Sequence, residues 1–188
     1  MDEYKIAFQR KENTFVTMGR LAKVKNQQAI IEAFSKVNGW KLKLIGEGDK
    51  QSQLKQLVLE LGERDRISFT GALDPPFPEL AKCKVFLLTS LYEGFPNAVL
   101  EAMALGIPVI SYDCDTGPRE IITDGKDGFL IPMHNIDMLV EKMKLLMKDK
   151  NLLQEMSKNA VESSKKYEGS LIIKEWESLF KRVLNEKR

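Results

Sequence analysis

The segment KVFLLTSLYEGFPNAVLEAMALGIPVISYD, residues 84–113, contains two apolar runs that flank a stretch with helical spacing. Residues 84–90 and 107–113 are short and rich in β-branched and aliphatic side chains, which predicts strands. Between them, the apolar positions of residues 96–105 recur at intervals of three and four, which predicts an amphipathic helix. We therefore expect this segment to form a strand–helix–strand unit.

The same alternation extends through the preceding part of the chain. Strands are expected at residues 14–19, 40–46 and 66–71, and amphipathic helices at residues 26–37 and 50–61. This rhythm predicts an α/β, Rossmann-like fold, in which a parallel sheet carries helices on both faces. Ligands of such sheets bind beyond the carboxyl ends of the strands, so candidate binding residues are expected in the loops there. After Pro132 the pattern is helical only.

Length and composition narrow the class of protein. The 188 residues suit a single domain, 1–188, with a core at 14–132 and C-terminal helices at 134–184. A net charge of +2 gives no overall field of the kind that marks nucleic-acid binders. Cys83 and Cys114 lack metal-site spacing and are too few for a disulfide framework, which favours a reducing, cytoplasmic location. No signal peptide or membrane-spanning run is evident.

Two carboxylates, Glu93 and Glu101, flank the start of the central predicted helix. Gly94 permits a sharp turn before it, and Pro96 suits the first helical position. Because the first N–H groups of a helix lack partners and carry the positive end of its dipole, the turn can bind an anion. Ionised carboxylates beside that turn could accept hydrogen bonds from sugar hydroxyls. Taken alone, two ordinary helix glutamates explain the spacing more simply.

A basic loop, GRLAKVKN, follows the first predicted strand. Arg20 comes directly after Gly19, and Lys25 lies five residues further on. Two cations directed at one diphosphate would each add a charge-assisted hydrogen bond of roughly 1.5 to 3 kcal/mol. A solvated basic loop is the alternative interpretation.

Two other features have ordinary explanations. Gly46 and Gly48 lie between a strand and a helix, but Gln51 stands where a dinucleotide fingerprint needs its third glycine, so the pair is explained by turning alone. Asp113 and Asp115 imitate a metal-binding D-x-D element without an evident third ligand, and turn or cap chemistry explains them.

The chain contains one histidine, His134. It follows Pro132 near an expected helix start, with neither a second histidine nor a nucleophile motif beside it. A surface or capping role is therefore expected for it.

Six motifs together resemble the nucleotide-sugar half of GT-B glycosyltransferases, specifically glycosyltransferase family 4, the glycosyl transferases group 1. In chain order they are GRLAKVKN, LIGEGDK, FTGAL, TSLYEGFPNAVLEAMALGIPVISYD, TGPREII and GKDGFLIP. The resemblance extends from about residue 14 to about residue 184. One departure is Gly117 followed by Pro118, where the family commonly has a glycine pair.

The resemblance implies roles for particular residues. Arg20 and Lys25 would hold the donor diphosphate, Glu101 would bind the ribose hydroxyls, and Glu93 would be the catalytic residue beside the transferred sugar. The base would lie against the GEG loop and the TGAL turn. The other donor-binding residues implied are Gly19, Gly46, Gly48, Gly71, Leu73, Gly94, Phe95, Asn97 and Ala98.

The resemblance also implies a reaction: transfer of a sugar from a UDP-sugar with retention at the anomeric carbon, in bacterial polysaccharide, lipopolysaccharide, capsule or glycolipid assembly. Because protein cations and a helix N-terminus would stabilise the departing diphosphate, neither a metal nor another cofactor is expected. A stand-alone nucleotide-binding or partner-binding module of the same fold is the main alternative. A GT-B sugar-nucleotide epimerase is a remoter one.

The family's N-terminal acceptor domain has no counterpart in this sequence. The chain alone is therefore expected to bind donor weakly and turn over little or nothing, and Met1 is interpreted as a truncated start. Peripheral membrane association would occur through the absent domain. The last predicted helix, residues 170–184, either packs on that domain through Ile172, Ile173, Trp176 and Phe180 or closes the core of this one.

Overall fold

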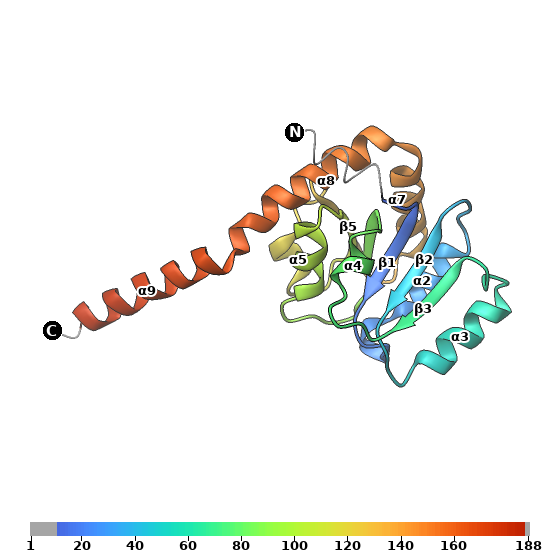
Figure 1. Cartoon of the computed structure of the whole chain (residues 1–188), viewed down its shortest axis with the longest axis horizontal. Coiled ribbons are helices and arrows are strands. Elements are labelled where there is room, and N and C mark those ends of the chain that lie inside the picture. The colour runs from blue at the N-terminus through green and yellow to red at the C-terminus, as the bar shows by residue number, and fades with distance from the viewer. Residues whose placement is uncertain (1–10, 187–188) are drawn as a thin grey trace.

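A computed structural model describes residues 11–186, so both ends of the predicted domain 1–188 lie outside the described residues. Within that range the structure contains a six-stranded parallel sheet of order β3-β2-β1-β4-β5-β6 (Figure 1). The strands are β1 (Thr14–Met18), β2 (Lys41–Ile45), β3 (Ile67–Gly71), β4 (Val85–Leu88), β5 (Val109–Tyr112) and β6 (Gly128–Ile131). The predicted parallel α/β fold is confirmed.

Helices and helical turns connect these strands and form the whole described chain beyond β6. They are η1 (Lys23–Lys25), α2 (Gln27–Phe34), α3 (Gln51–Glu60), α4 (Phe77–Leu80), α5 (Asn97–Ala104), α6 (Pro118–Ile121), α7 (Ile136–Lys148), α8 (Lys150–Ser164), η2 (Lys165–Tyr167) and α9 (Gly169–Glu186). The predicted all-helical C-terminal segment is confirmed. Pro96 is the N-cap of α5 rather than its first helical residue.

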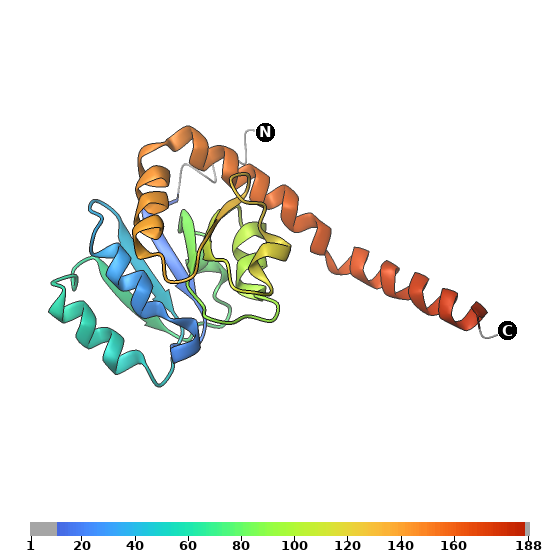
Figure 2. The ribbon, with the colours of Figure 1, turned by 180° about the vertical axis from the view of Figure 1, so that it is seen from behind.

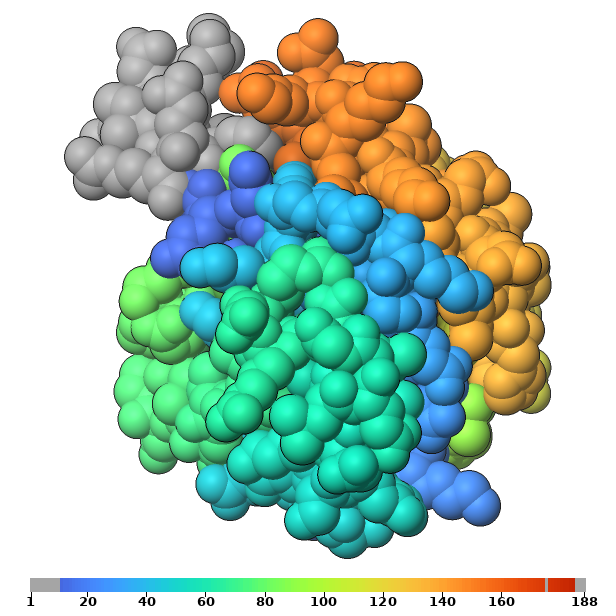
Figure 3. All heavy atoms as spheres, turned by 90° about the vertical axis from the view of Figure 1, so that its right-hand side faces the viewer, coloured from blue at the N-terminus to red at the C-terminus, as the bar shows by residue number. Residues whose placement is uncertain are grey.

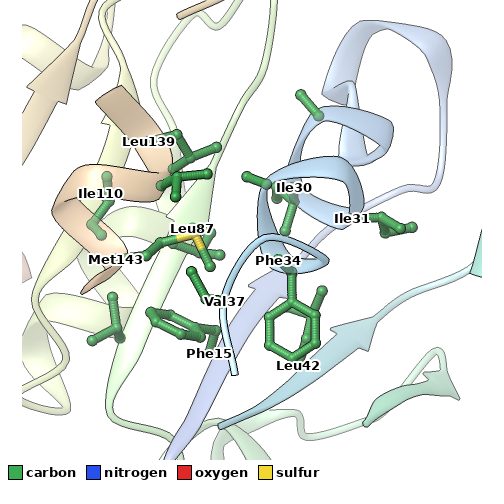
Figure 4. Packing of buried hydrophobic residues seen from close by; sticks show 14 of the residues in the cluster. Phe15, Ile30, Ile31, Phe34, Val37, Leu42, Leu87, Ile110, Leu139 and Met143 are labelled. Atoms are coloured by element: carbon green, nitrogen blue, oxygen red, sulfur yellow. The ribbon is translucent and has the colours of Figure 1, made fainter. Parts of the chain in front are cut away.

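Alternate residues of the central strands enter two separate hydrophobic clusters, one on each face of the sheet. In β1, Phe15 joins the cluster covered by α2, α3 and α7, while Val16 joins the cluster beneath α4, α5 and α6. Figure 4 shows Phe34 of α2 and Met143 of α7 packed around Phe15 and Leu87. Because both faces are covered, the central strand β4 is apolar and buried along its whole length.

Helix α8 links the two faces. Its first half places Leu153 and Met156 in the first cluster, and its second half places Ala160 in the other. The buried carboxylate of Asp127 accepts a hydrogen bond of 2.7 Å from Ser163 of α8 and one of 2.8 Å from the N–H of Thr123. This contact ties α8 to the turn before β6.

Helices α2, α3 and α7 cover one face of the sheet. Figure 3 views the β3 edge, where α3 lies in front of the sheet. From behind, Figure 2 shows α2 and α7 side by side across the central strands, in agreement with their shared hydrophobic cluster.

Helix α9 extends away from the rest of the molecule (Figures 1 and 2). Most of its apolar side chains are exposed, including Trp176 at 55% and Phe180 at 59%, and Ile172 is half-buried. Of the two interpretations of this segment, the structure therefore contradicts closure of its own core. No helix of residues 11–186 has the length and apolar character to span a bilayer.

His134 is exposed, has a positive φ of 63°, and lies beside the ring of Tyr112 at a centroid distance of 6.3 Å. The cap of α7 is its neighbour Asn135, whose side chain accepts a hydrogen bond from the N–H of Met138. The expected surface role of the histidine is thus confirmed, and the adjacent asparagine supplies the cap.

Candidate functional site

The strand order reverses between β1 and β4. From β1 the chain proceeds outward to β2 and β3, then returns to place β4 on the other side of β1 and continues to β5 and β6. In an open parallel sheet, the loops diverge at such a switch point and leave a crevice beyond the carboxyl ends of the strands. The loops that follow β1 and β4 therefore border the candidate site.

The sequence-predicted residues lie along this edge. They leave from the carboxyl ends of four neighbouring strands: Gly19, Arg20 and Lys25 after β1; Gly46 and Gly48 after β2; Gly71 and Leu73 at and after β3; Glu93, Gly94 and Phe95 after β4. Asn97 and Ala98 form the first turn of α5, and Glu101 follows one turn later. The parallel topology accordingly brings segments that are far apart in sequence to one edge.

Lys25 and Glu93 form an ion pair across the switch point. The ammonium Nζ of Lys25 donates to Oε1 of Glu93 at 2.6 Å. The side chain of Glu93 is 8% exposed and that of Lys25 is 29% exposed. An ammonium has three N–H donors, so Lys25 can hold Glu93 and still donate to an anion at the mouth.

The burial of Glu93 decides between two interpretations of the E-x7-E spacing. Glu93 lies outside the helix, is buried, and is paired with a cation 68 residues away in sequence. Removing the partner of a buried carboxylate costs roughly 3 to 5 kcal/mol, because the charge stays desolvated. An ordinary solvated helix glutamate is therefore wrong for Glu93.

Glu101 and Arg20 are placed differently from that pair. Glu101 is half-buried on α5, and its carboxylate has no partner among the side chains that the structure describes. Arg20 is exposed, and its carbonyl accepts a hydrogen bond of 2.9 Å from the buried amide of Gln27. Both side chains are thus available to a ligand at this edge.

No side chain of the described part of the chain caps the start of α5, whose N-cap is Pro96. The N–H of Asn97 bonds the carbonyl of Phe95 at 3.0 Å, and that of Val99 bonds the carbonyl of Pro96 at 2.9 Å. The helix dipole still directs its positive end toward the mouth, beside the Glu93 turn. An anion at this point would meet that positive end and the cation of Lys25.

Gly46 and Gly48 have a role that local sequence reasoning missed. A Cβ at Gly46 would lie 2.0 Å from the carbonyl oxygen of Gly19, and a Cβ at Gly48 would lie 2.2 Å from that of Leu21. The loop after β2 therefore packs backbone to backbone on the loop that carries Arg20. These glycines permit a close approach between loops, in addition to turning.

The loop between β5 and α6 also contacts the Glu93 turn. Gly117 has a φ of +91°, and a Cβ there would lie 2.6 Å from the carbonyl oxygen of Gly94. The neighbouring Thr116 donates to the carbonyl of Glu93. Sequence reasoning missed Thr116 and Thr89, although hydroxyl residues at strand ends offered a signal.

Asp113 of the D-x-D-like sequence forms a surface ion pair. Asp113 accepts a hydrogen bond of 2.9 Å from Nε of Arg119 at the surface. The Asp113 carboxylate raises the pKa of Arg119 further above its ordinary value. Among the described residues, no group of three or more histidine, cysteine, aspartate or glutamate side chains is arranged to hold a metal ion.

Comparison with known proteins assigns this arrangement to a family. Residues 2–163 match the family described as glycosyl transferases group 1. The chain belongs to this family. S. aureus TarM, solved in complex with Fondaparinux, alpha-GlcNAc-glycerol and UDP, is similar to the chain with a TM-score of 0.85 and 28% identity. The similarity covers 90% of this chain and 35% of TarM, and it confirms the resemblance to the GT-B fold.

Two curated relatives of the group 1 chain are also similar in sequence. An exopolysaccharide phosphotransferase of Streptomyces coelicolor is 35% identical over 179 residues, which are 93% of this chain and 19% of the relative. The poly(glycerol-phosphate) alpha-glucosyltransferase of Bacillus subtilis is 32% identical over 165 residues, which are 86% of this chain and 24% of the relative. The chain thus spans a quarter or less of each relative.

Proposed function

We propose that this group 1 chain is the donor-binding part of a retaining glycosyltransferase that uses a UDP-sugar in polysaccharide or glycolipid assembly. The observation that carries the proposal is the Lys25–Glu93 pair at the switch point between β1 and β4, next to the uncapped start of α5. UDP in the TarM complex supports the choice of nucleotide.

In the proposed complex, Lys25 and the exposed Arg20 bind the diphosphate. When UDP departs from the sugar, negative charge develops on the phosphate that was bonded to the sugar. The fixed cations and the N-terminus of α5 stabilise that charge. Protein groups supply the stabilisation, so no metal is included in the proposed mechanism. Glu93 faces the transferred sugar, and the half-buried Glu101 accepts hydrogen bonds from the ribose hydroxyls.

The remaining predicted contacts complete the proposed donor site. The base lies against the Gly46–Gly48 loop, with Gly71 and Leu73 as its other wall, and the main chain of residues 94–98 contacts sugar and phosphate. Leu73 packs against the cluster that also holds Ile45, which gives that wall an apolar backing. The close contact between the Gly48 loop and the Arg20 loop would couple base binding to phosphate binding.

We also propose that transfer requires an acceptor-binding domain in addition to this chain, and that the domain covers the exposed apolar side of α9. The chain alone would then bind donor and turn over little or nothing. The gene region upstream of Met1 tests this part. An in-frame segment that encodes a second Rossmann-like unit supports it, and an in-frame stop codon directly before Met1 contradicts it.

Calorimetric titration with UDP tests the donor site. Glu101→Ala is expected to weaken UDP binding at least tenfold, about 1.4 kcal/mol, because the ribose hydroxyls lose their acceptor. The matched control is Glu155→Ala, which removes an exposed carboxylate from α8 and should leave the affinity unchanged. Equal affinities for wild type and Glu101→Ala would exclude Glu101 from the nucleotide site.

A further inference from the structure

Two threonines, the buried Thr89 and the exposed Thr116, each bond to the main chain at or next to one partner of the central ion pair. The hydroxyl of Thr89, directly after β4, donates to the carbonyl of Asn26 at 2.8 Å and lies 3.4 Å from the carbonyl of Lys25. The hydroxyl of Thr116 donates to the carbonyl of Glu93 at 2.5 Å. One threonine therefore fixes the lysine side of the pair and the other fixes the glutamate side.

Neither side of the pair is held by the sheet itself. Lys25 ends the short turn η1, and Asn26 after it has a left-handed φ of 49°, which an L-residue rarely adopts. The buried Thr89, which is 1% exposed, donates its hydroxyl hydrogen bond to the carbonyl of this residue. A further bond of 2.8 Å, from the N–H of Leu91 to the carbonyl of Val24, joins the same two loops.

The Glu93 side is supported from behind by the loop after β5. Gly117 packs against Gly94 so closely that a Cβ would meet its carbonyl oxygen at 2.6 Å and Cβ of Glu93 at 3.4 Å. The thiol of the buried Cys114 bonds the carbonyl of Thr116 at 3.4 Å and braces the loop that presents the hydroxyl. Thr116 thus connects a supported loop to the main chain of Glu93.

We propose that Thr89 and Thr116 are positioning residues that set the alignment of Lys25 with Glu93, and through it the placement of the donor's diphosphate and sugar. This inference rests on the proposed function of the same site. The 2.6 Å contact between the Lys25 ammonium and the Glu93 carboxylate requires the main chain on both sides to be correctly placed. The hydrogen bond from each threonine hydroxyl restricts the movement of the main chain on one side. Thr89 acts through Lys25 on the diphosphate, whereas Thr116 acts through Glu93 on the sugar.

Valine substitutions test the proposal, because valine keeps the branched shape and loses the hydroxyl donor. UDP, UDP-glucose and UDP-N-acetylglucosamine are titrated into each variant of the full chain by calorimetry. Thr89→Val is expected to weaken UDP binding at least fivefold. Thr116→Val is expected to leave UDP binding within twofold while lowering the affinity of whichever UDP-sugar the wild type binds better at least fivefold.

Further variants separate positioning from general damage. Thr89→Ser and Thr116→Ser keep the donor and should restore binding. Thr14→Val makes the same change at the opposite end of β1, where the buried hydroxyl has no hydrogen-bond partner among residues 11–186, and should alter no affinity. In a Glu93→Gln background, Thr116→Val should have no additional effect on sugar affinity, because the residue acts through Glu93.

Two results overturn the inference while leaving the proposed function intact. One is wild-type affinity in both valine variants. The other is an equal loss of UDP and UDP-sugar binding in Thr116→Val that Thr116→Ser fails to restore or that persists in the Glu93→Gln background. A wild type that binds no UDP overturns the proposed function first, and the inference with it.

Discussion

At the scale of single residues, the site combines groups that sequence could identify with contacts that it could not. Glu93, Lys25 and Arg20 were each identifiable from charge and position after a strand. The ion pair was not, because it joins positions 68 residues apart whose meeting depends on β1 and β4 being neighbours. Gly46 and Gly48 show the same limit: turning is local, whereas packing on a second loop is a tertiary contact.

Lys11 provides a residue-scale prediction about pH. Its ammonium donates to the carbonyls of Leu105 and Gly106 at 2.8 and 3.1 Å, at the carboxyl end of α5. Burial lowers the pKa of Lys11 from 10.5 to about 8. Between these values the unfolded chain binds more protons at this amine than the folded chain, so the contribution of Lys11 to stability rises with pH across that window.

The measurement is urea unfolding of the wild type and Lys11→Met at pH 7 and pH 10. The wild-type free energy of unfolding minus that of Lys11→Met should increase by roughly 1 to 3 kcal/mol between the two pH values. Burial raises the pKa of Cys83 to about 11, which has the opposite sign. This burial is common to both proteins, whereas the smaller lowering of the Cys83 pKa by the charge of Lys11 is lost in Lys11→Met. The exposed Lys158→Met is the control. A difference that stays constant with pH would contradict the buried position of Lys11.

At the scale of elements, the spacing of apolar residues predicted the helices and strands that have enough residues to show a period. The expected helices 26–37, 50–61 and 96–105 match α2, α3 and α5 to within three residues. The sequence reasoning missed β6, because a four-residue strand that begins with glycine has little strand signal. The helices α4 and α6, of four residues each, are too short to show a period.

Helix α9 supports a second element-scale prediction. The ring centroids of Trp176 and Phe180 lie 5.7 Å apart, and both residues are more than half exposed. Replacing both with glutamate should change the free energy of unfolding of the remaining structure by less than about 0.5 kcal/mol, because they contribute nothing to its two cores. The same change should reduce self-association by removing an apolar surface.

Urea unfolding and static light scattering measure these two effects. Leu153→Glu in the neighbouring α8, at a position that is 2% exposed, serves as the positive control and should cost several kcal/mol, because it buries a charge. A loss of 2 kcal/mol or more in the Trp176→Glu, Phe180→Glu variant would mean that α9 packs on its own domain in solution.

At the scale of the whole molecule, strand–helix alternation was sufficient to predict a parallel sheet covered on both faces. It was insufficient to predict the order β3-β2-β1-β4-β5-β6, which the structure shows. That order matters for function because it creates the switch point between β1 and β4. The cationic loop after β1, the buried carboxylate after β4 and the start of α5 meet there as a consequence of topology.

The central claim is that this junction binds a nucleoside diphosphate, and a crystal structure of the chain grown with UDP tests it most directly. The account predicts phosphate oxygens within hydrogen-bond distance of Lys25 and Arg20 beside the first turn of α5, with the ribose hydroxyls on Glu101. UDP bound at another surface, or at this edge with Arg20 and Glu101 both directed away from it, would contradict the account.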